Sequence, residues 1–255
     1  MAKGRVRNGE AMMNGGCVDE QDSAPRWTAG NGLARVASTV ALVALGACAT
    51  TGSAPSGTPV DGRNIAARAV ESSALDRPYQ VVFDWNLTEP GARMSGQGVA
   101  RLEPPANVRL DLFTNRGERV AVAALVGEEL RVPRYDQTEL PPAPFLWASL
   151  GVFLPNGSAA PAEGWQQDNG TVELRYAQPD GDVLAYRLAN DRVEELRSLR
   201  NGRTREELRL VLRSDDPFPR EAVYRHLEDV RELRISLESV EHVESHPTDI
   251  WDPGT

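Results

Sequence analysis

The chain has 255 residues, of which 40% are apolar, so it is long enough for one domain with a hydrophobic core and terminal extensions. Its 37 acidic residues outnumber its 28 lysines and arginines, and the formal net charge of −9 disfavours nucleic acid as a partner. Its two cysteines, Cys17 and Cys48, both lie near the N-terminus, which excludes a disulfide framework or a thiolate metal site from the rest of the chain.

The N-terminal region has the pattern of an export signal. The apolar stretch 36–47 is shorter than the roughly 20 residues that span a bilayer, but it has the length of a signal-peptide core. It ends in Leu-Gly-Ala-Cys, which resembles the lipobox of bacterial lipoprotein signals, where the cysteine is acylated and the peptide is cut before it. We therefore expect residues 1–34 to be a disordered leader or an over-extended gene start, 35–47 a lipoprotein signal peptide, and Cys48 the lipid attachment site. The alternative is a generic export signal that contains a cysteine by chance.

The remaining chain predicts a tether followed by a mainly β domain. Residues 48–63 are rich in Thr, Gly, Ser and Pro, which favours a flexible tether before a domain over 64–246. Asn64 can cap a helix that runs to Asp76. Apolar and polar residues then alternate in segments separated by turn residues, which predicts antiparallel strands over 79–87, 95–102, 107–113, 119–127, 128–132, 171–177, 182–189 and 233–238.

Three further segments need separate interpretation. An uncharged apolar run predicts a short helix over 144–150, either an ordinary core helix or a cap over an open sheet. Around Asn201-Gly202, residues 191–213 predict a hairpin, although apolar residues spaced by three also allow a helix. Residues 214–221 are expected to form a loop and 247–255 a C-terminal tail. The fold class is mainly β (α+β), with about nine to eleven strands, two short helices and no βαβ alternation.

Three sequence stretches, in this order, resemble a known family: VRLDLFTNRGERVAVAAL, LGVFLP and DRVEELRSLRNGRTREELRLV. They are similar to elements of the bacterial lipoprotein-localisation factor superfamily (LolA and LolB type), nearest to its lipid-anchored receptor branch or to a related uncharacterised lipoprotein. The resemblance implies a curved antiparallel half-barrel whose concave face is plugged by short helices and holds acyl chains, without an enzymatic activity or a cofactor. It also implies a lipid-anchored monomer on the periplasmic face of the outer membrane. Its partners would be the membrane, acylated lipoproteins or lipids, and a soluble periplasmic carrier.

The inward apolar side chains of the predicted strands and helix are the candidates for the acyl-chain cavity: Phe83, Trp85, Leu87, Leu110, Leu112, Val122, Phe145, Trp147, Leu150, Phe153, Leu174 and Tyr186. The same residue types can also form a filled core, which leaves a non-catalytic envelope scaffold as the alternative function. The receptor branch carries an exposed, membrane-facing leucine in one turn. The resemblance places Phe113 and Arg116 at this turn.

Motifs for catalysis or metal binding are weak. His242, Glu244 and His246 alternate as on one face of a strand, but they lack H-E-x-x-H spacing, so we expect a solvated strand end and no metal. No G-x-S-x-G elbow occurs, which makes an envelope hydrolase the least favoured reading. The paired glutamates 194–195 and 206–207 are expected to form an exposed ladder with Arg197, Arg200, Arg205 and Arg209.

Overall fold

The computed structural model describes residues 57–133, 139–155, 161, 163–214 and 216–254. The chain divides into two units, Met1–Cys48 and Ala49–Thr255, and every described element belongs to the second. The expected leader, signal peptide and lipidated Cys48, and the tether up to residue 56, lie outside the described residues.

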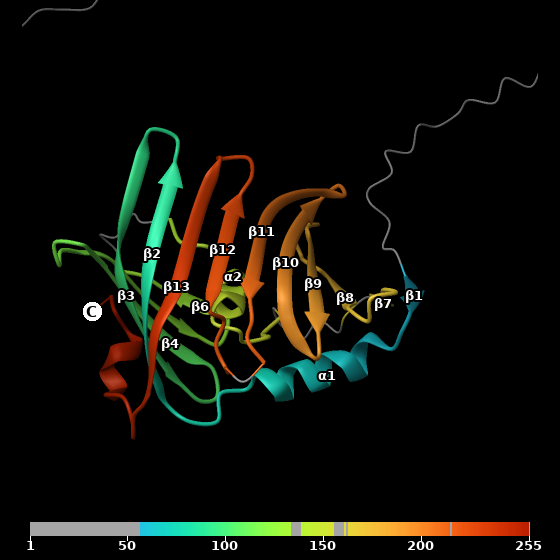
Figure 1. Ribbon diagram of the computed structural model, residues 1–255, viewed down its shortest axis with the longest axis horizontal. Helices are drawn as coiled ribbons and strands as arrows, with labels where there is room; N and C mark the ends of the chain where they lie inside the picture. The colour runs from blue at the N-terminus through green and yellow to red at the C-terminus, as the bar shows by residue number, and fades with distance from the viewer. Residues whose placement is uncertain (1–56, 134–138, 156–160, 162, 215, 255) are drawn as a thin grey trace, which may run out of the picture. The chain divides into compact units, whose positions relative to one another are not determined.

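Thirteen antiparallel strands form one curved sheet that does not close, in the order β1-β7-β8-β9-β10-β11-β12-β13-β2-β3-β4-β5-β6 (Figure 1). The mainly β fold class is confirmed, with more strands than the nine to eleven predicted. The strands are β1 Thr58–Pro59, β2 Tyr79–Glu89, β3 Ala92–Glu103, β4 Asn107–Thr114, β5 Arg119–Val126, β6 Glu129–Arg131, β7 Glu163–Gln166, β8 Val172–Ala177, β9 Val183–Ala189, β10 Arg192–Arg200, β11 Arg203–Val211, β12 Glu221–His226 and β13 Arg231–His242.

Most strands pair with their neighbours in sequence, so the sheet consists of two meanders joined along one seam. The seam pairs β2 with β13 over almost their full lengths, with Tyr79 opposite His242 and Thr88 opposite Glu232. The predicted hairpin around Asn201-Gly202 is confirmed, since Arg200 pairs with Arg203 and both turn residues have positive φ.

Some elements differ from the sequence predictions. The strand β12 was missed, because only its first residue fell inside the segment expected as a loop and the rest was left unassigned. The short strand β1 lies in the expected tether and pairs with β7, which was also missed. In the expected C-terminal tail, a 3-10 helix, η1 (Thr248–Trp251), contacts β4 and β5. Local sequence gave no apolar alternation for β1 and β7, and they form only because tertiary pairing completes their hydrogen bonds.

Two helices accompany the sheet. Helix α1 (Gly62–Ser73) is capped by Asp61, whose carboxylate accepts a hydrogen bond from the Arg63 backbone N–H at 3.0 Å. The predicted cap, Asn64, is therefore wrong; its side chain instead donates to Asp61 at 2.7 Å. Helix α2 (Ala143–Ser149) forms where a short helix was predicted, with Pro144 in its first turn.

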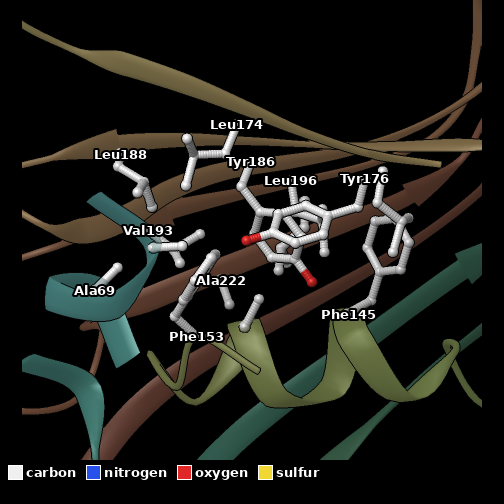
Figure 2. Close-up of a cluster of buried hydrophobic side chains, with 14 of the residues drawn as sticks. Ala69, Phe145, Phe153, Leu174, Tyr176, Tyr186, Leu188, Val193, Leu196 and Ala222 are labelled. Carbon is white, nitrogen blue, oxygen red and sulfur yellow. The ribbon is translucent and has the colours of Figure 1, made fainter. Parts of the chain in front are cut away.

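Helix α2 lies on the concave face, where its side chains help to build two apolar clusters. The first cluster joins α2 to α1 and to β8–β12, with Phe153 packed against Tyr176 and Tyr186 (Figure 2) and Phe145 against Tyr224. The second cluster joins α2 to β2–β5 and contains Trp147, which is 1% exposed. Most of the concave face is thus a filled core rather than an open cavity.

The opposite, convex face carries a ladder of arginine–carboxylate pairs. Asp111 accepts from Arg101 at 2.7 Å and from Arg109 at 2.9 Å, while Glu173 accepts from Arg175 and Arg197 at 2.7 Å each. The predicted ladder is confirmed only for Arg209, which binds Glu195 and Glu207. The other three arginines bind carboxylates outside the predicted pairs: Arg197 binds Glu173, Arg200 binds Asp182 and Arg205 binds Glu228. The predicted exposure is wrong for Glu195, which is buried, and Glu206 turns to the concave face.

Candidate functional site

A cavity of about 510 Å³ opens at one end of the concave face. Strands β2–β5 and β11–β13 form one wall, and the segment 139–142 in front of α2 forms the other. Its volume lies in the range of small-molecule sites. It is lined by Trp85, Leu87, Glu89, Met94, Leu112, Val120, Ala121, Glu139, Leu140, Pro141, Pro142, Glu206, Tyr224, His226, Arg231 and Leu233.

Strand register brings the apolar lining together. Leu87 on β2 lies opposite Leu233 on β13, and Leu112 on β4 lies opposite Ala121 on β5. Between them, β3 presents Gly96 and Gly98 opposite Trp85 and Phe83. A Cβ at Gly98 would lie 2.3 Å from the Phe83 ring, so the absence of a side chain in β3 lets the aromatic rings of β2 fold over this strand.

Charged and polar groups gather at the mouth of the cavity. Arg231 donates to Glu139 at 2.7 Å and to Glu89 at 3.2 Å, which ties the segment before α2 to the sheet. The Tyr224 hydroxyl donates to Glu206 at 2.6 Å. Burial, together with the Glu206 carboxylate, raises the pKa of Tyr224, so its hydroxyl remains a donor. An apolar interior with a polar mouth suits an amphiphile whose tail enters and whose head stays near water.

Only part of the predicted cavity lies here. Of the twelve predicted residues, Trp85, Leu87 and Leu112 line the cavity. The other nine do not line it, because they fill the two clusters or face away: Phe83, Leu110, Trp147 and Leu150 belong to the second cluster, and Phe145, Phe153, Leu174 and Tyr186 to the first. Val122 pairs with Asp111 and therefore lies on the convex face, opposite to Leu110 and Leu112.

Several lining residues were missed by sequence reasoning. Tyr224 and His226 come from the missed strand β12, although Ala222, Tyr224 and His226 alternate in the way that marks one strand face. Met94 precedes the segment that was predicted as the second strand, because β3 begins three residues earlier than expected. Leu233 was placed in the last predicted strand but was not assigned to the site.

The residues of the predicted membrane-facing turn point in different directions. Phe113 is half-buried and lines a second pocket, on the convex face, together with Arg101 and Arg109. Arg116 is exposed in the turn between β4 and β5. A contact between this turn and a membrane stays a prediction. Phe113 could insert its apolar side chain into the membrane only after that side chain had rearranged.

The C-terminal histidines have structural contacts. His242 ends β13 and its ring centroid lies 4.8 Å from that of Tyr79, while His246 follows the strand, with Nε2 at 3.0 Å from the Tyr79 carbonyl oxygen. His246 is buried, so the expected solvated strand end is wrong for this residue. Over the described ranges, no three His, Cys, Asp or Glu residues are placed to hold a metal ion.

Two hydroxyls inside the first cluster lack hydrogen-bond partners among the described residues, those of Tyr176 and Tyr186. Burial raises the pKa of Tyr176 to about 12. We expect Tyr186→Phe to stabilise the domain by about 1 kcal/mol, because it removes an unsatisfied buried hydroxyl while keeping the ring contacts with Phe153. Urea unfolding measures this difference, with Tyr224→Phe as the control, which should destabilise because its hydroxyl is bonded to Glu206. A loss of stability in Tyr186→Phe would contradict the expectation.

Comparisons with known proteins agree with this architecture. No protein-family model and no curated protein sequence matches the chain. A LolA superfamily protein from Nitrosomonas europaea is 13% identical with a TM-score of 0.47, over 75% of this chain and 97% of that one. A DUF1329 family protein from Desulfovibrio piger is 8% identical with a TM-score of 0.51, over 75% and 95%. An outer membrane lipoprotein-sorting protein domain from Vibrio parahaemolyticus is 8% identical with a TM-score of 0.45, over 74% and 95%.

At these sequence identities the comparisons show a similarity of fold alone. Of the three structures, the DUF1329 family protein, with a TM-score of 0.51, supports that similarity. The chain shares the fold of the DUF1329 family protein and forms an unclosed curved sheet with a helix on its concave face, which is the architecture that the sequence resemblance predicted. In the part of the chain that the structure covers, no helix is both long and apolar enough to cross a bilayer.

Proposed function

We propose that this chain binds acyl chains of lipids or lipoproteins in the cavity at the end of its concave face. The observation that carries the proposal is the cavity of about 510 Å³, apolar inside and polar at the mouth, in a LolA/LolB-like fold. A tail packed against Leu87, Leu112 and Leu233 would bury apolar surface, at about 0.8 kcal/mol per CH₂ group. No covalent step is part of this function.

The proposal extends to location and partners through the N-terminal sequence. The lipobox-like Leu-Gly-Ala-Cys supports acylation of Cys48 and attachment to a bacterial envelope membrane, for which the outer membrane is our proposal. A domain held there is suited to receive lipoproteins from a soluble carrier. The competing function is a lipid-anchored scaffold, and it is favoured by the filled clusters around α2.

A charge inside the cavity tests the proposal directly. Leu87→Glu is expected to weaken binding of a triacylated lipopeptide by about 100-fold, because an acyl chain would have to desolvate the new carboxylate. The half-buried position and the open mouth let the carboxylate reach water, so the domain should stay folded. Displacement of an environment-sensitive hydrophobic dye measures the affinity.

The matched control is Leu237→Glu. Leu237 is half-buried on β13 and does not line the cavity, so its replacement should leave lipopeptide affinity unchanged. If the folded wild-type domain takes up neither dye nor lipopeptide, the acyl-binding function is wrong and the scaffold function stands.

A further inference from the structure

Five hairpin turns lie at the end of the sheet where the cavity opens. The strand pairing shows this. At the end of β2, Thr88 pairs with Arg93 of β3 and with Glu232 of β13, and at the end of β12, His226 pairs with Glu206 of β11 and with Arg231 of β13. The turns follow β2, β4, β8, β10 and β12, and those after β2, β10 and β12 point to the same end in Figure 1. The β12–β13 turn, residues 227–230, is flanked on both sides by residues that line the cavity, His226 and Arg231.

Exposed apolar side chains concentrate at this mouth. Among the described residues, six large apolar side chains are exposed, and three of them lie here: Met94 at 42%, Leu227 at 44% and Val230 at 71%. Met94 also lines the cavity, so the apolar surface continues from the interior onto the rim. Exposed apolar residues gathered at a single opening indicate a contact surface, whereas scattered ones need no explanation.

Val230 combines exposure with an unfavourable backbone. Its φ is +53°, a left-handed conformation that is unfavourable for a β-branched residue. Stability alone favours Asn or Gly at such a position, and solubility favours a polar side chain. A valine that opposes both preferences at the tip of a turn therefore points to a function for its apolar side chain.

Arginines complete the surface. Arg93, Arg116 and Arg203 are exposed in or next to three of the other turns, and none has a carboxylate partner among the described residues. Most arginines elsewhere in the described structure are in ion pairs. Within the β12–β13 turn, Glu228 is bound by Arg205 at 2.9 Å and Asp229 lies 3.1 Å from His226, so these carboxylates are already engaged.

We propose that this mouth surface, Leu227 and Val230 with the three arginines, docks on an anionic lipid bilayer. The two apolar side chains would enter the headgroup boundary, and the arginines would bind lipid phosphates. This inference rests on the proposed function in one respect, since docking by the mouth would give an acyl chain a short path between bilayer and cavity.

A probe placed in the turn tests the docking. A chain that starts at Ala49 keeps every described element and contains no cysteine, so Val230→Cys provides a single labelling site for a nitrobenzoxadiazole fluorophore. With phosphatidylglycerol-containing vesicles, we expect its emission to shift to the blue and to strengthen. The same label at Val211→Cys, 50% exposed at the opposite end of β11, should not respond. No response at residue 230, or an equal response at both positions, would overturn the proposal.

Val230→Asn separates docking from stability and from cavity binding. Asparagine tolerates a positive φ, so the melting temperature should rise by about 2–4 °C, while vesicle partitioning falls about tenfold. Lipopeptide affinity in the absence of vesicles should not change. Unchanged partitioning would overturn the docking and favour a protein partner for this surface. Vesicle binding through residue 230 without lipopeptide uptake would overturn the proposed function alone.

Discussion

Trp147→Ala is expected to lower the free energy of unfolding by about 3–5 kcal/mol, which is the usual cost of deleting a large buried aromatic side chain. Trp147 is 1% exposed on α2, and its indole N–H donates to the Gly127 carbonyl at 2.7 Å. The substitution leaves a void between α2 and β2–β5 and removes the hydrogen-bond donor to the half-buried Gly127 carbonyl. Chemical denaturation followed by circular dichroism measures the loss, and Trp147→Glu should not fold at all.

The control for this substitution is Trp165→Ala. Trp165 lies half-buried on β7 near the edge of the sheet, so its loss should cost about 1 kcal/mol or less. The comparison also tests the role that the sequence predicted for Trp147. A Trp147→Ala domain that keeps its stability but loses lipopeptide binding would make Trp147 a ligand contact rather than a core residue.

The second large effect is expected at Gly96. A Cβ at this position would lie 1.8 Å from the Phe113 carbonyl oxygen, and backbone atoms cannot move aside cheaply. That same oxygen accepts a hydrogen bond from the Trp85 indole at 3.2 Å. Gly96→Ala must therefore separate β3 from β4 and disturb Trp85, and we expect a loss of more than about 4 kcal/mol in unfolding free energy.

Gly117→Ala is the control that separates the steric clash at Gly96 from the cost of placing a residue with a Cβ atom at a positive φ. Gly117 has φ +83° in the β4–β5 turn, with no atom near enough to contact a new Cβ, so only the left-handed backbone is penalised. We expect a loss of about 1–2 kcal/mol. Similar losses at both glycines in equilibrium unfolding would show that steric approach at Gly96 is relieved by a small shift of the strands.

The sequence predicted the face of most side chains but not which of them leave space. Alternation placed Phe83, Trp85 and Leu87 on one side of β2, and the structure agrees, because a strand turns successive side chains to opposite faces. Whether an inward side chain lines a cavity or fills a core depends on what lies across from it. Trp147 and Phe145 were indistinguishable from cavity residues until α2 was seen to carry both into the core.

Two further features depend on tertiary context. Val122 fits the apolar alternation of β5, but its pairing with Asp111 on β4 places it on the convex face. Register depends on how two strands pair, and the sequence of one strand does not reveal it. The strand β12 follows a proline-containing segment and is only six residues long; the expected loop reached its first residue and the other five were left unassigned. Because β12 was not predicted, Tyr224 and His226 were not among the expected site residues.

The seam between β2 and β13 has a consequence for the order in which the molecule matures. The chain enters its folding compartment from its N-terminus, so β2–β6 can form a local meander early, whereas the outer edge of β2 gains its partner only after residues 231–242 have arrived. Until then β2, eleven residues long, exposes unpaired amide and carbonyl groups that other chains can pair with. Closing this seam joins segments that are separated by most of the domain sequence, and such non-local pairings form slowly.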